Sequence, residues 1–364
     1  MELRRQTLDL NKYTRTIVTS DLHGDYDGFI NMLKKCDFHQ DDVLIIVGDI
    51  LEKGTQSLKL LQTIIQLSKT YAIFPLLGNN DTFFEEWNHH LYNEQQLLGY
   101  LKSHHHSIFH EMASQLSIDI IDDQSVKYLM QQIYLTYAEE IEYLCSLPHI
   151  IETSSYLFVH AGLSKEALKN HDIDTCLTWK EFGYETNEFN KTMIVGHWPA
   201  SNYCRDIICV NPYFHPNNMI SIDGGNSMKS WEQINYLIIQ NDKITYDYYD
   251  SLPKVQLLDD QNENKDYFSV QFPNTKIEII SSSDDRTLCK VLSLDKMIEV
   301  KTNQIYSYKG NTYMADLTTY KMKLQKNDIV SLCKYYDDRI LIKKDGIISI
   351  YKGRFRLINE TKGA

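Results

Sequence analysis

The sequence predicts an α/β fold, in which helices cover layers of buried β-strands. Three observations predict it: short aliphatic runs in the first two thirds of the chain, helical patterns between the first three runs, and a polar cluster directly after each run. The runs span residues 15–19, 43–47, 72–77 and 156–159. Continuous apolar runs of this length are typical of strands that are buried on both faces.

The segments between the first three runs predict amphipathic helices. Residues 26–36 carry apolar side chains at Phe29, Ile30 and Leu33, and residues 56–67 repeat leucine and isoleucine at a similar spacing. Such spacing places the apolar side chains on one helical face. The resulting order of strand, helix, strand, helix and strand indicates a layered α/β core that presents polar residues where the strands end.

The chain between about residues 82 and 147 is long, polar and rich in helix-forming residues. We predict a helical insertion that lies over the sheet. Strand patterns return after Pro199, at residues 219–222, 236–239 and 243–249. Residues 1–250 are therefore expected to form one domain.

From about residue 251 the pattern changes to short alternating segments separated by turn sequences such as SSSDD, YKGN and KKDG. Examples are residues 275–280, 296–302 and 339–343. This spacing predicts a small β-rich domain over residues 251–364. The final DGIISIYKG stretch is similar to the last hairpin of an SH3-like barrel. Such a domain can dock a partner or substrate, or stabilise the core, and its residues leave these roles open.

Composition excludes several classes of protein. The formal net charge of −12 argues against a nucleic-acid partner and against an anionic membrane surface. The apolar runs are all shorter than the roughly 20 residues of a membrane span. Seven cysteines without a CxxC pair, and an N-terminus without a signal-peptide pattern, predict reduced thiols in a cytoplasmic protein.

Five predicted strands end in a side chain that can bind a metal ion, usually beside a glycine. These side chains, in chain order, are Asp21 with His23, Asp49, Asn79, His160 and His197. Carboxylate, imidazole and amide ligands suit Mn²⁺, Fe or Zn²⁺ better than a thiolate-preferring ion. Two such ions about 3.5–4 Å apart can hold a phosphoryl group for in-line attack.

The motifs around these residues resemble those of a known family. DLHG, GD followed five residues later by glycine, GNND, HAGL and GHWP occur in the order of the phosphoprotein phosphatases, within the calcineurin-like metallophosphoesterases. The resemblance covers residues 15–240, and GDILEKG, TWKEF and SIDGGN are similar to a bacterial branch of serine/threonine phosphatases. It implies a layered β-sandwich flanked by helices.

The resemblance also implies roles for the individual residues. Asp21, His23 and Asp49 would hold a first metal ion. Asp49 would bridge to a second ion, which Asn79, His160 and His197 would complete. The nucleophile would be a hydroxide that bridges two divalent ions, with Mn²⁺ expected and Fe or Zn²⁺ as alternatives. Asp223 matches a position near the site.

Three positions depart from the family pattern. Glu52-Lys53 replaces an Asp-Arg pair, Asn80 replaces a histidine, and Lys180 replaces an arginine. Lysine neutralises phosphate as a point charge but does not orient it as the planar arginine fork does. We take Asp49, Glu52 and Asn80 as candidate catalytic residues, and Lys53, Lys180 and Asn79 as candidate phosphate-binding residues.

The replacement at Asn80 has a chemical consequence, because the resemblance implies that the family histidine donates a proton to the leaving oxygen. General-acid help is worth about 10²–10⁴ in rate. Either leaving groups that need little protonation are preferred, such as aryl phosphates or phosphoanhydrides, or His89 or His90 substitutes as the acid. The run His104–His106 with His110 is interpreted as an exposed helix surface rather than a metal site, although residues 106 and 110 could share a face.

Three functions remain open. The first is a metal-dependent phosphatase acting on phosphoserine or phosphothreonine in proteins, with phosphotyrosine or small phosphoesters as further substrates. The second is hydrolysis of a nucleotide anhydride such as a dinucleoside polyphosphate. The third is a catalytically weak protein that binds a phosphorylated partner without cleaving it.

Overall fold

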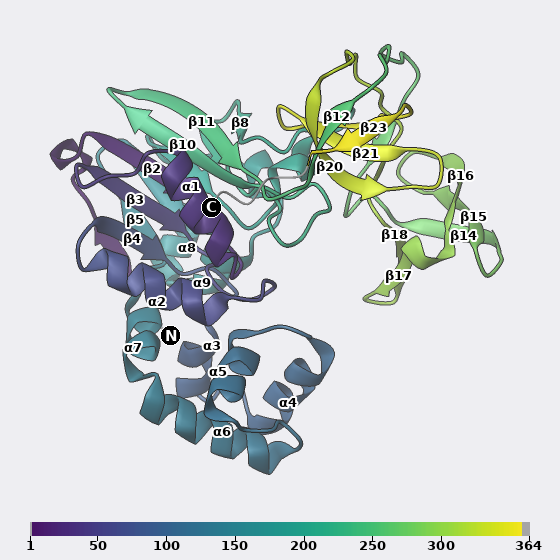
Figure 1. The fold of residues 1–364 in the computed structure, drawn as a ribbon. Helices are drawn as coiled ribbons and strands as arrows, with labels where there is room; N and C mark the ends of the chain where they lie inside the picture. The colour runs from purple at the N-terminus through teal and green to yellow at the C-terminus, as the bar shows by residue number, and fades with distance from the viewer. Residues whose placement is uncertain (1, 359–364) are drawn as a thin grey trace. The chain divides into compact units, whose positions relative to one another are not determined.

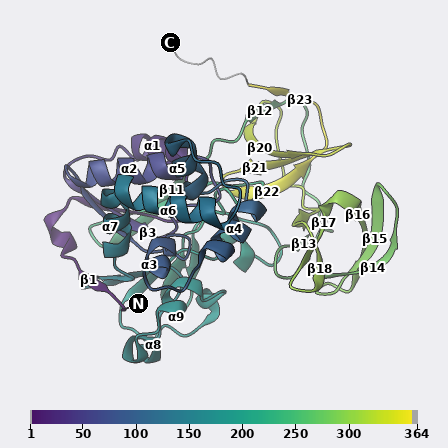
Figure 2. The same cartoon turned by 90° about the horizontal axis from the view of Figure 1, so that it is seen from below.

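The computed structural model describes residues 2–358, which form two compact units. The first unit comprises the chain up to Ala200 together with Val210–Ser251. The second comprises Ser201–Cys209 and the chain from Leu252 onward. Figures 1 and 2 show the elements of both units.

The first unit is built on two sheets. In the order of their hydrogen bonding, the strands of the five-stranded sheet are β11 (Lys243–Tyr249), β10 (Ile234–Gln240), β2 (Arg15–Thr19), β3 (Asp42–Val47) and β4 (Ala72–Leu76). Those of the six-stranded sheet are β1 (Arg5–Thr7), β5 (Ile150–Glu152), β6 (Tyr156–Val159), β7 (Thr192–Val195), β9 (Met219–Ser221) and β8 (Tyr213–His215). Strands β2, β3 and β4 are parallel neighbours, as are β6, β7 and β9.

Side chains from both sheets share one hydrophobic core. Val18 and Val47 of the first sheet pack in the same cluster as Phe158 and Ile194 of the second. The predicted layered β-sandwich is therefore confirmed. Strand β6, which follows the helical insertion in the chain, belongs to the second sheet rather than to the sheet of the first three predicted strands.

Two helices between the parallel strands form an outer layer on the first sheet. They are α1 (Tyr26–Lys35) and α2 (Ser57–Ser68), both within one residue of the predicted bounds. Two short helices, α8 (Lys165–Asn170) and α9 (Ile173–Thr178), follow β6 in the chain. The helices therefore flank the sandwich as predicted (Figure 1).

The predicted helical insertion is confirmed and contains five helices. They are α3 (Phe83–Asn88), α4 (Glu94–Ser103), α5 (Ile108–Leu116), α6 (Asp123–Thr136) and α7 (Ala138–Ser146). Helices α5 and α7 pack against α2, so the insertion extends the helical layer instead of lying directly over the sheet. The cause is in α2, whose Leu58, Leu60 and Leu61 are all buried. A helix that is apolar on more than one face needs packing partners on both sides.

The second unit is β-rich, as predicted, and has two separate cores. Its five-stranded sheet has the order β22 (Ile347–Tyr351), β21 (Ile340–Lys344), β20 (Ile329–Tyr335), β12 (Lys254–Leu257) and β23 (Phe355–Leu357). The other core lies among β13 (Ser269–Val270), β14 (Ile277–Ser282), β15 (Arg286–Val291), β16 (Lys296–Lys301), β17 (Ile305–Tyr308), β18 (Asn311–Met314) and β19 (Leu317–Thr318).

The predicted final hairpin is formed by β21 and β22. Asp345 and Gly346 connect the strands with φ angles of 51° and 77°. Two successive positive φ angles are required by the type I′ turn, which favours Asp-Gly. The backbone of Ile348 in β22 donates to the carbonyl of Ile208 at 2.9 Å, which ties the Ser201–Cys209 segment to this unit. Within residues 2–358, each helix is too short or too polar to cross a membrane.

Arg4 joins the N-terminal segment to both ends of the insertion. Its guanidinium donates two hydrogen bonds of 2.7 Å to the carboxylate of Glu85 in α3. Its Nε donates to the carbonyl of Leu147 at 2.8 Å. Burial alone would raise the pKa of Glu85, but the hydrogen bonds and charge of Arg4 outweigh burial and lower this pKa.

We predict that Glu85→Gln lowers the free energy of unfolding by about 1–2 kcal/mol at pH 7, since the partly exposed Arg4 weakens the pair through solvent screening. A lowered folded-state pKa stabilises the fold above the unfolded pKa, and this contribution is lost as the pH falls through the folded value. The difference between wild type and variant in urea unfolding should therefore shrink at acidic pH. The matched control is Glu139→Gln, because Glu139 pairs with Lys69 on the exposed surface. An equal loss in both variants would contradict the prediction.

Candidate metal centre

The carboxyl ends of five strands bring the six predicted metal ligands to one region of the sandwich. Asp21 and His23 follow β2, Asp49 follows β3, and Asn79 follows β4. His160 and His197 follow β6 and β7 of the other sheet. Parallel strands end at the same edge of a sheet, so side chains distant in the sequence meet there.

The charged and imidazole side chains form two groups that share Asp49. One group is Asp21, His23 and Asp49, and the other is Asp49, His160 and His197. Within each group the potential ligand atoms lie within 4.8 Å of one another. Two overlapping groups with one common carboxylate are the arrangement expected for two neighbouring ions with a bridging ligand.

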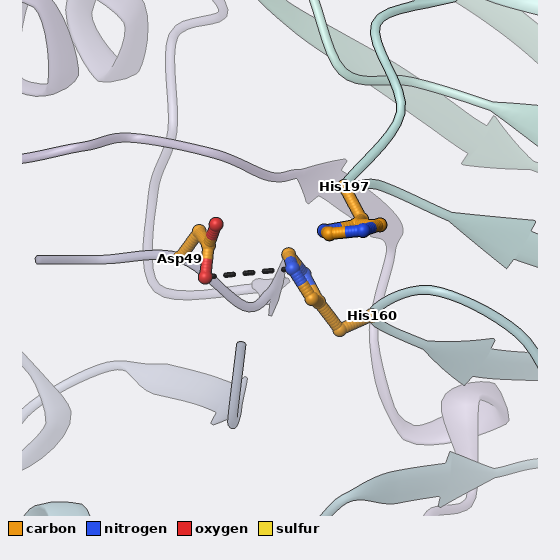
Figure 3. A group of neighbouring side chains, drawn as sticks. All are labelled: Asp49, His160 and His197. Atoms are coloured by element: carbon orange, nitrogen blue, oxygen red, sulfur yellow. Dashed lines mark ion pairs between the residues drawn. The ribbon is translucent and has the colours of Figure 1, made fainter. Parts of the chain in front are cut away.

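The distances show how the imidazoles converge on the shared carboxylate. His160 Nε2 lies 3.4 Å from Asp49 Oδ1 (Figure 3) and 3.1 Å from Asn79 Oδ1. His23 Nε2 lies 3.8 Å from Asp49 Oδ2 and 3.9 Å from Asp21 Oδ1. Each carboxylate oxygen of Asp49 thus faces a different histidine, and Asn79 joins the second group.

Backbone carbonyls orient the histidine rings. His160 Nδ1 lies 2.9 Å from the carbonyl of Val47, and His23 Nδ1 lies 3.3 Å from that of Leu51. A hydrogen bond from Nδ1 to a carbonyl leaves Nε2 available as a ligand atom. His197 Nε2 is buried and has no hydrogen-bond partner within residues 2–358. A buried nitrogen of this kind fits a metal ligand, because burial without any partner is costly.

The ligand-bearing loops hold unusual backbone conformations. Asp21, His23, Asp49 and His197 all have positive φ angles, of 54°, 47°, 53° and 62°. Residues other than glycine rarely adopt this region, and such strain gathers at functional sites. Gly78 allows the loops to approach, because a Cβ atom there would stand 2.1 Å from Asp49 Oδ1.

Several carboxyl groups are buried together in the site. Burial, the charge of Asp223 and then other neighbours raise the pKa of Asp21 well above its usual range. Burial raises the pKa of Asp223 to about 6. Burial opposes ionisation of Asp49 as well, but His160, His23 and Asn80 outweigh it and hold its pKa far below the usual value. Buried carboxylates are stable when they are paired or coordinate metals, so the donor set fits divalent ions.

Asp81 organises the site, although the sequence analysis gave it no role. It is buried and accepts hydrogen bonds from the backbone of Ile50, Leu51 and Gly78, at 3.0, 3.0 and 2.9 Å. Burial and the charge of Asp49 raise the pKa of Asp81 to about 7. This carboxyl ties the loop after β3 to the loop after β4. Asp81 follows Asn79 and Asn80 in the GNND motif, and this position could have indicated a role in the site.

Glu52 has surroundings that differ from those expected of a catalytic group. Its carboxylate accepts a 2.5 Å hydrogen bond from the hydroxyl of Tyr100 and a 3.0 Å bond from the backbone of Ile108. Both partners belong to the helical insertion. Both carboxylate oxygens of Glu52 thus accept hydrogen bonds from the insertion, which ties the site loop to it.

Asn80 contacts the shared carboxylate directly. Its backbone NH donates to Asp49 Oδ1 at 2.9 Å, and its side-chain amide donates to Oδ2 at 2.6 Å. Asn80 thus orients Asp49 and helps to keep it ionised. An amide has no readily transferable proton, so the geometry gives this residue no role as a general acid.

Lys53 and Lys180 are both exposed, and the charge of each contributes to lowering the pKa of one histidine of the site. The charge of Lys53 contributes to lowering the pKa of His23, after burial as the main cause. Burial, and then the charges of His160 and Lys180, lower the pKa of His197 to about 4. Both lysines therefore lie within electrostatic reach of the site histidines. Asp223 lies near the site as expected, and its charge contributes to raising the pKa of Asp21.

The remaining histidine candidates lie outside the two groups. His89 and His90 are exposed at the end of α3. His104 follows α4, whereas His106 precedes Ser107, the residue that caps α5. The run His104–His106 therefore forms a connection between two helices, so the predicted helix surface is wrong for these residues, and residues 106 and 110 share no helical face. The cap at Ser107 starts a new helix between them.

The sandwich carries two overlapping groups of potential metal ligands at the ends of its strands. The family model for calcineurin-like phosphoesterases matches residues 14–212, which is more than half of the chain. This chain therefore belongs to the calcineurin-like phosphoesterase family.

Individual relatives share only part of the sequence. Over 62 residues the chain is 39% identical to a symmetrical bis(5′-nucleosyl)-tetraphosphatase of Wigglesworthia glossinidia brevipalpis. That segment is 17% of this chain and 22% of the relative, so the chain spans about a fifth of the length of this curated relative.

Two solved structures match about two thirds of this chain at low sequence identity. A proposed diadenosine tetraphosphatase is 17% identical, with a TM-score of 0.42, over 68% of this chain and 99% of that one. A serine/threonine phosphatase from Saccharomyces cerevisiae is 14% identical, with a TM-score of 0.41, over 69% of this chain and 85% of that one.

We predict that Mn²⁺ raises the melting temperature of the wild-type protein and that Asp49→Asn removes the effect, because Asp49 belongs to both donor groups. At a metal concentration of about 100 times Kd, the rise should be about 5–10 °C. Metal analysis of the desalted proteins checks the same point. The control is Asp174→Asn, an exposed acid of α9. An equal response of wild type and Asp49→Asn would contradict the assignment.

Proposed function

We propose that this chain is a metal-dependent phosphatase that hydrolyses phosphomonoesters, with phosphorylated protein side chains as its substrates. The observation that carries the proposal is the pair of donor groups that share Asp49. When bound at Asp21, His23, Asp49, Asn79, His160 and His197, two divalent ions such as Mn²⁺, Fe or Zn²⁺ would supply an acidic water and positive charge for the phosphoryl oxygens.

The surrounding residues support binding and orientation of a phosphate ester. Lys53 supplies a positive charge near His23, and Lys180 supplies one near His197. Both charges can neutralise the phosphate dianion. Asn80 holds the shared carboxylate by two hydrogen bonds, so Asp49 cannot rotate freely. Asp81 fixes the two loops that carry Asp49 and Asn79.

Hydrolysis of dinucleoside polyphosphates is a second candidate function. The similarity of 62 residues to a symmetrical bis(5′-nucleosyl)-tetraphosphatase supports it. The asparagine at position 80 supports it also, since a phosphate leaving group needs no proton. The third candidate, a protein that binds a phosphorylated partner without cleaving it, is supported only by the three departures at Lys53, Asn80 and Lys180.

We predict Mn²⁺-dependent phosphate release from phenyl phosphate and from a phosphopeptide by wild type. A chelator and the variant Asp49→Asn should each lower this release by at least about 10³, because several kcal/mol of transition-state stabilisation are lost. Asp174→Asn should behave as wild type. A metal-loaded wild type that cleaves only a dinucleoside tetraphosphate would favour the second candidate. Stoichiometric binding of the phosphopeptide without release would favour the third.

We predict a steep dependence of the wild-type rate on the pKa of the leaving group across substituted phenyl phosphates. Asn80→His should flatten this dependence, because imidazole can protonate the leaving oxygen. For the poorest leaving groups, Asn80→His should raise the rate by about 10²-fold or more. The control is Asn170→His, an exposed position at the end of α8. A flat dependence in the wild type would show that another residue already acts as the acid.

A further inference from the structure

A cavity of about 160 Å³ opens beside the metal-binding loop that follows β4. Asn79 and Asn80 form one part of its lining. The insertion supplies five aromatic side chains to the lining, namely Phe83, Phe84, Tyr92, Tyr100 and Phe109, beside aliphatic, hydroxyl and carboxylate groups. The lining is therefore mixed in polarity, and its volume is comparable to the roughly 150 Å³ of a cavity that holds a benzene ring.

The aromatic side chains form a rigid wall. The ring of Phe83 lies 4.9 Å from that of Tyr92 and 4.5 Å from that of Phe109, both in edge-to-face contact. Phe109 is buried in the hydrophobic core, whereas Phe83, Tyr92 and Tyr100 are only partly buried. The partly buried rings line the cavity while the core holds them in position, so they can pack against an aromatic guest.

The cavity adjoins the donor groups of the metal centre. Asn80 lines it and also donates a 2.6 Å hydrogen bond to Asp49, the carboxylate shared by both donor groups. Position 80 therefore lies between the shared carboxylate and the cavity. A group that departs toward Asn80 therefore enters this cavity.

The chemistry at Asn80 and the lining of the cavity select the same kind of leaving group. Asparagine cannot protonate the departing oxygen, so a weakly basic oxygen is preferred. The phenol of tyrosine has a pKa of about 10, whereas a serine or threonine alkoxide approaches the basicity of hydroxide, for which the pKa of water is about 15.7. A phenolate leaves without a general acid more readily than an alkoxide.

We propose that this cavity receives the ring of an aryl phosphate, and that phosphotyrosine side chains are the preferred substrates. This proposal rests on the proposed phosphatase function and specifies its substrate class. In the reaction the oxygen of water forms a bond to phosphorus while the bond from phosphorus to the phenolic oxygen breaks. The electron pair of that bond stays on the phenolate. One proton of the water reaches the phenolate through solvent, and the other remains on the phosphate.

The carboxylates of the cavity disfavour the anhydride alternative. Glu52 and Glu86 both belong to the lining. Glu86 accepts a hydrogen bond of 2.8 Å from the hydroxyl of Thr82, which orients it. A leaving nucleotide would bring further phosphate charges next to these acids, and like charges in a partly buried site repel strongly. A tyrosine ring carries no such charge.

The test compares phosphotyrosine and phosphothreonine peptides of identical sequence, each assayed for kcat/KM with Mn²⁺-loaded full-length protein. A dinucleoside tetraphosphate serves as the third substrate. Wild type should prefer the phosphotyrosine peptide by about 10²-fold or more, because the alkoxide lacks acid assistance. Tyr92→Ser should reduce this preference about tenfold, mainly through the KM for phosphotyrosine. The control is Tyr128→Ser, an exposed tyrosine of α6, and it should keep the wild-type ratio.

The outcomes distinguish failure of the aryl pocket from failure of the phosphatase function. Equal kcat/KM for the two peptides, or a ratio unaffected by Tyr92→Ser in a protein with wild-type melting temperature, would overturn the aryl pocket and leave the phosphatase function standing. If Tyr92→Ser unfolds, Phe83→Leu replaces it and must lower the same ratio. Preference for the tetraphosphate would overturn the aryl pocket in favour of the anhydride reaction. No turnover of any ester by metal-loaded protein would overturn the phosphatase function and the pocket together.

Discussion

The site depends on keeping one carboxylate, Asp49, ionised while it is buried. Removing a carboxylate from water is unfavourable by several kcal/mol unless charges or hydrogen bonds compensate. Here His160 and His23 face its two oxygens, and Asn80 donates to both. The backbone serves the same requirement, because Gly78 leaves the space that a side chain would fill against Asp49. The surrounding loops can therefore be understood as the structure needed to hold this single group.

The helical insertion is joined to the centre by polar contacts and is more than an appended layer. The carboxylate of Glu52 binds Tyr100 and the start of α5. In the other direction, Glu111 of α5 accepts hydrogen bonds from the backbone of Ser57 and Leu58, at the start of α2. Carboxylates at helix N-termini satisfy free NH groups and interact favourably with the helix dipole. These reciprocal contacts hold the aromatic wall at a constant position beside Asn79 and Asn80.

Much of the fold could be predicted because the local patterns were strong. Strands β2 and β6 have the predicted bounds, since continuous aliphatic runs buried on both faces leave little choice of conformation. The candidate ligands were visible because each follows such a run. Asp81 was overlooked because its partners are backbone NH groups, which every residue has and no sequence pattern reveals. The break between His106 and α5 was overlooked because a cap at Ser107 competes with an otherwise helical stretch.

The sequence by itself determined the alternation of the first three strands with two helices, the family motifs and the chemistry that Asn80 cannot perform. These features are local, because they depend on periodicity and on the kind of side chain at a position. Only the tertiary structure decided that Glu52 faces the insertion, that Asn80 holds Asp49, and that aromatic side chains from Phe83 to Phe109 surround one cavity beside the centre. Such relations join residues far apart in the chain. They arise from how α2 and the insertion pack together, and that packing is a property of the assembled core.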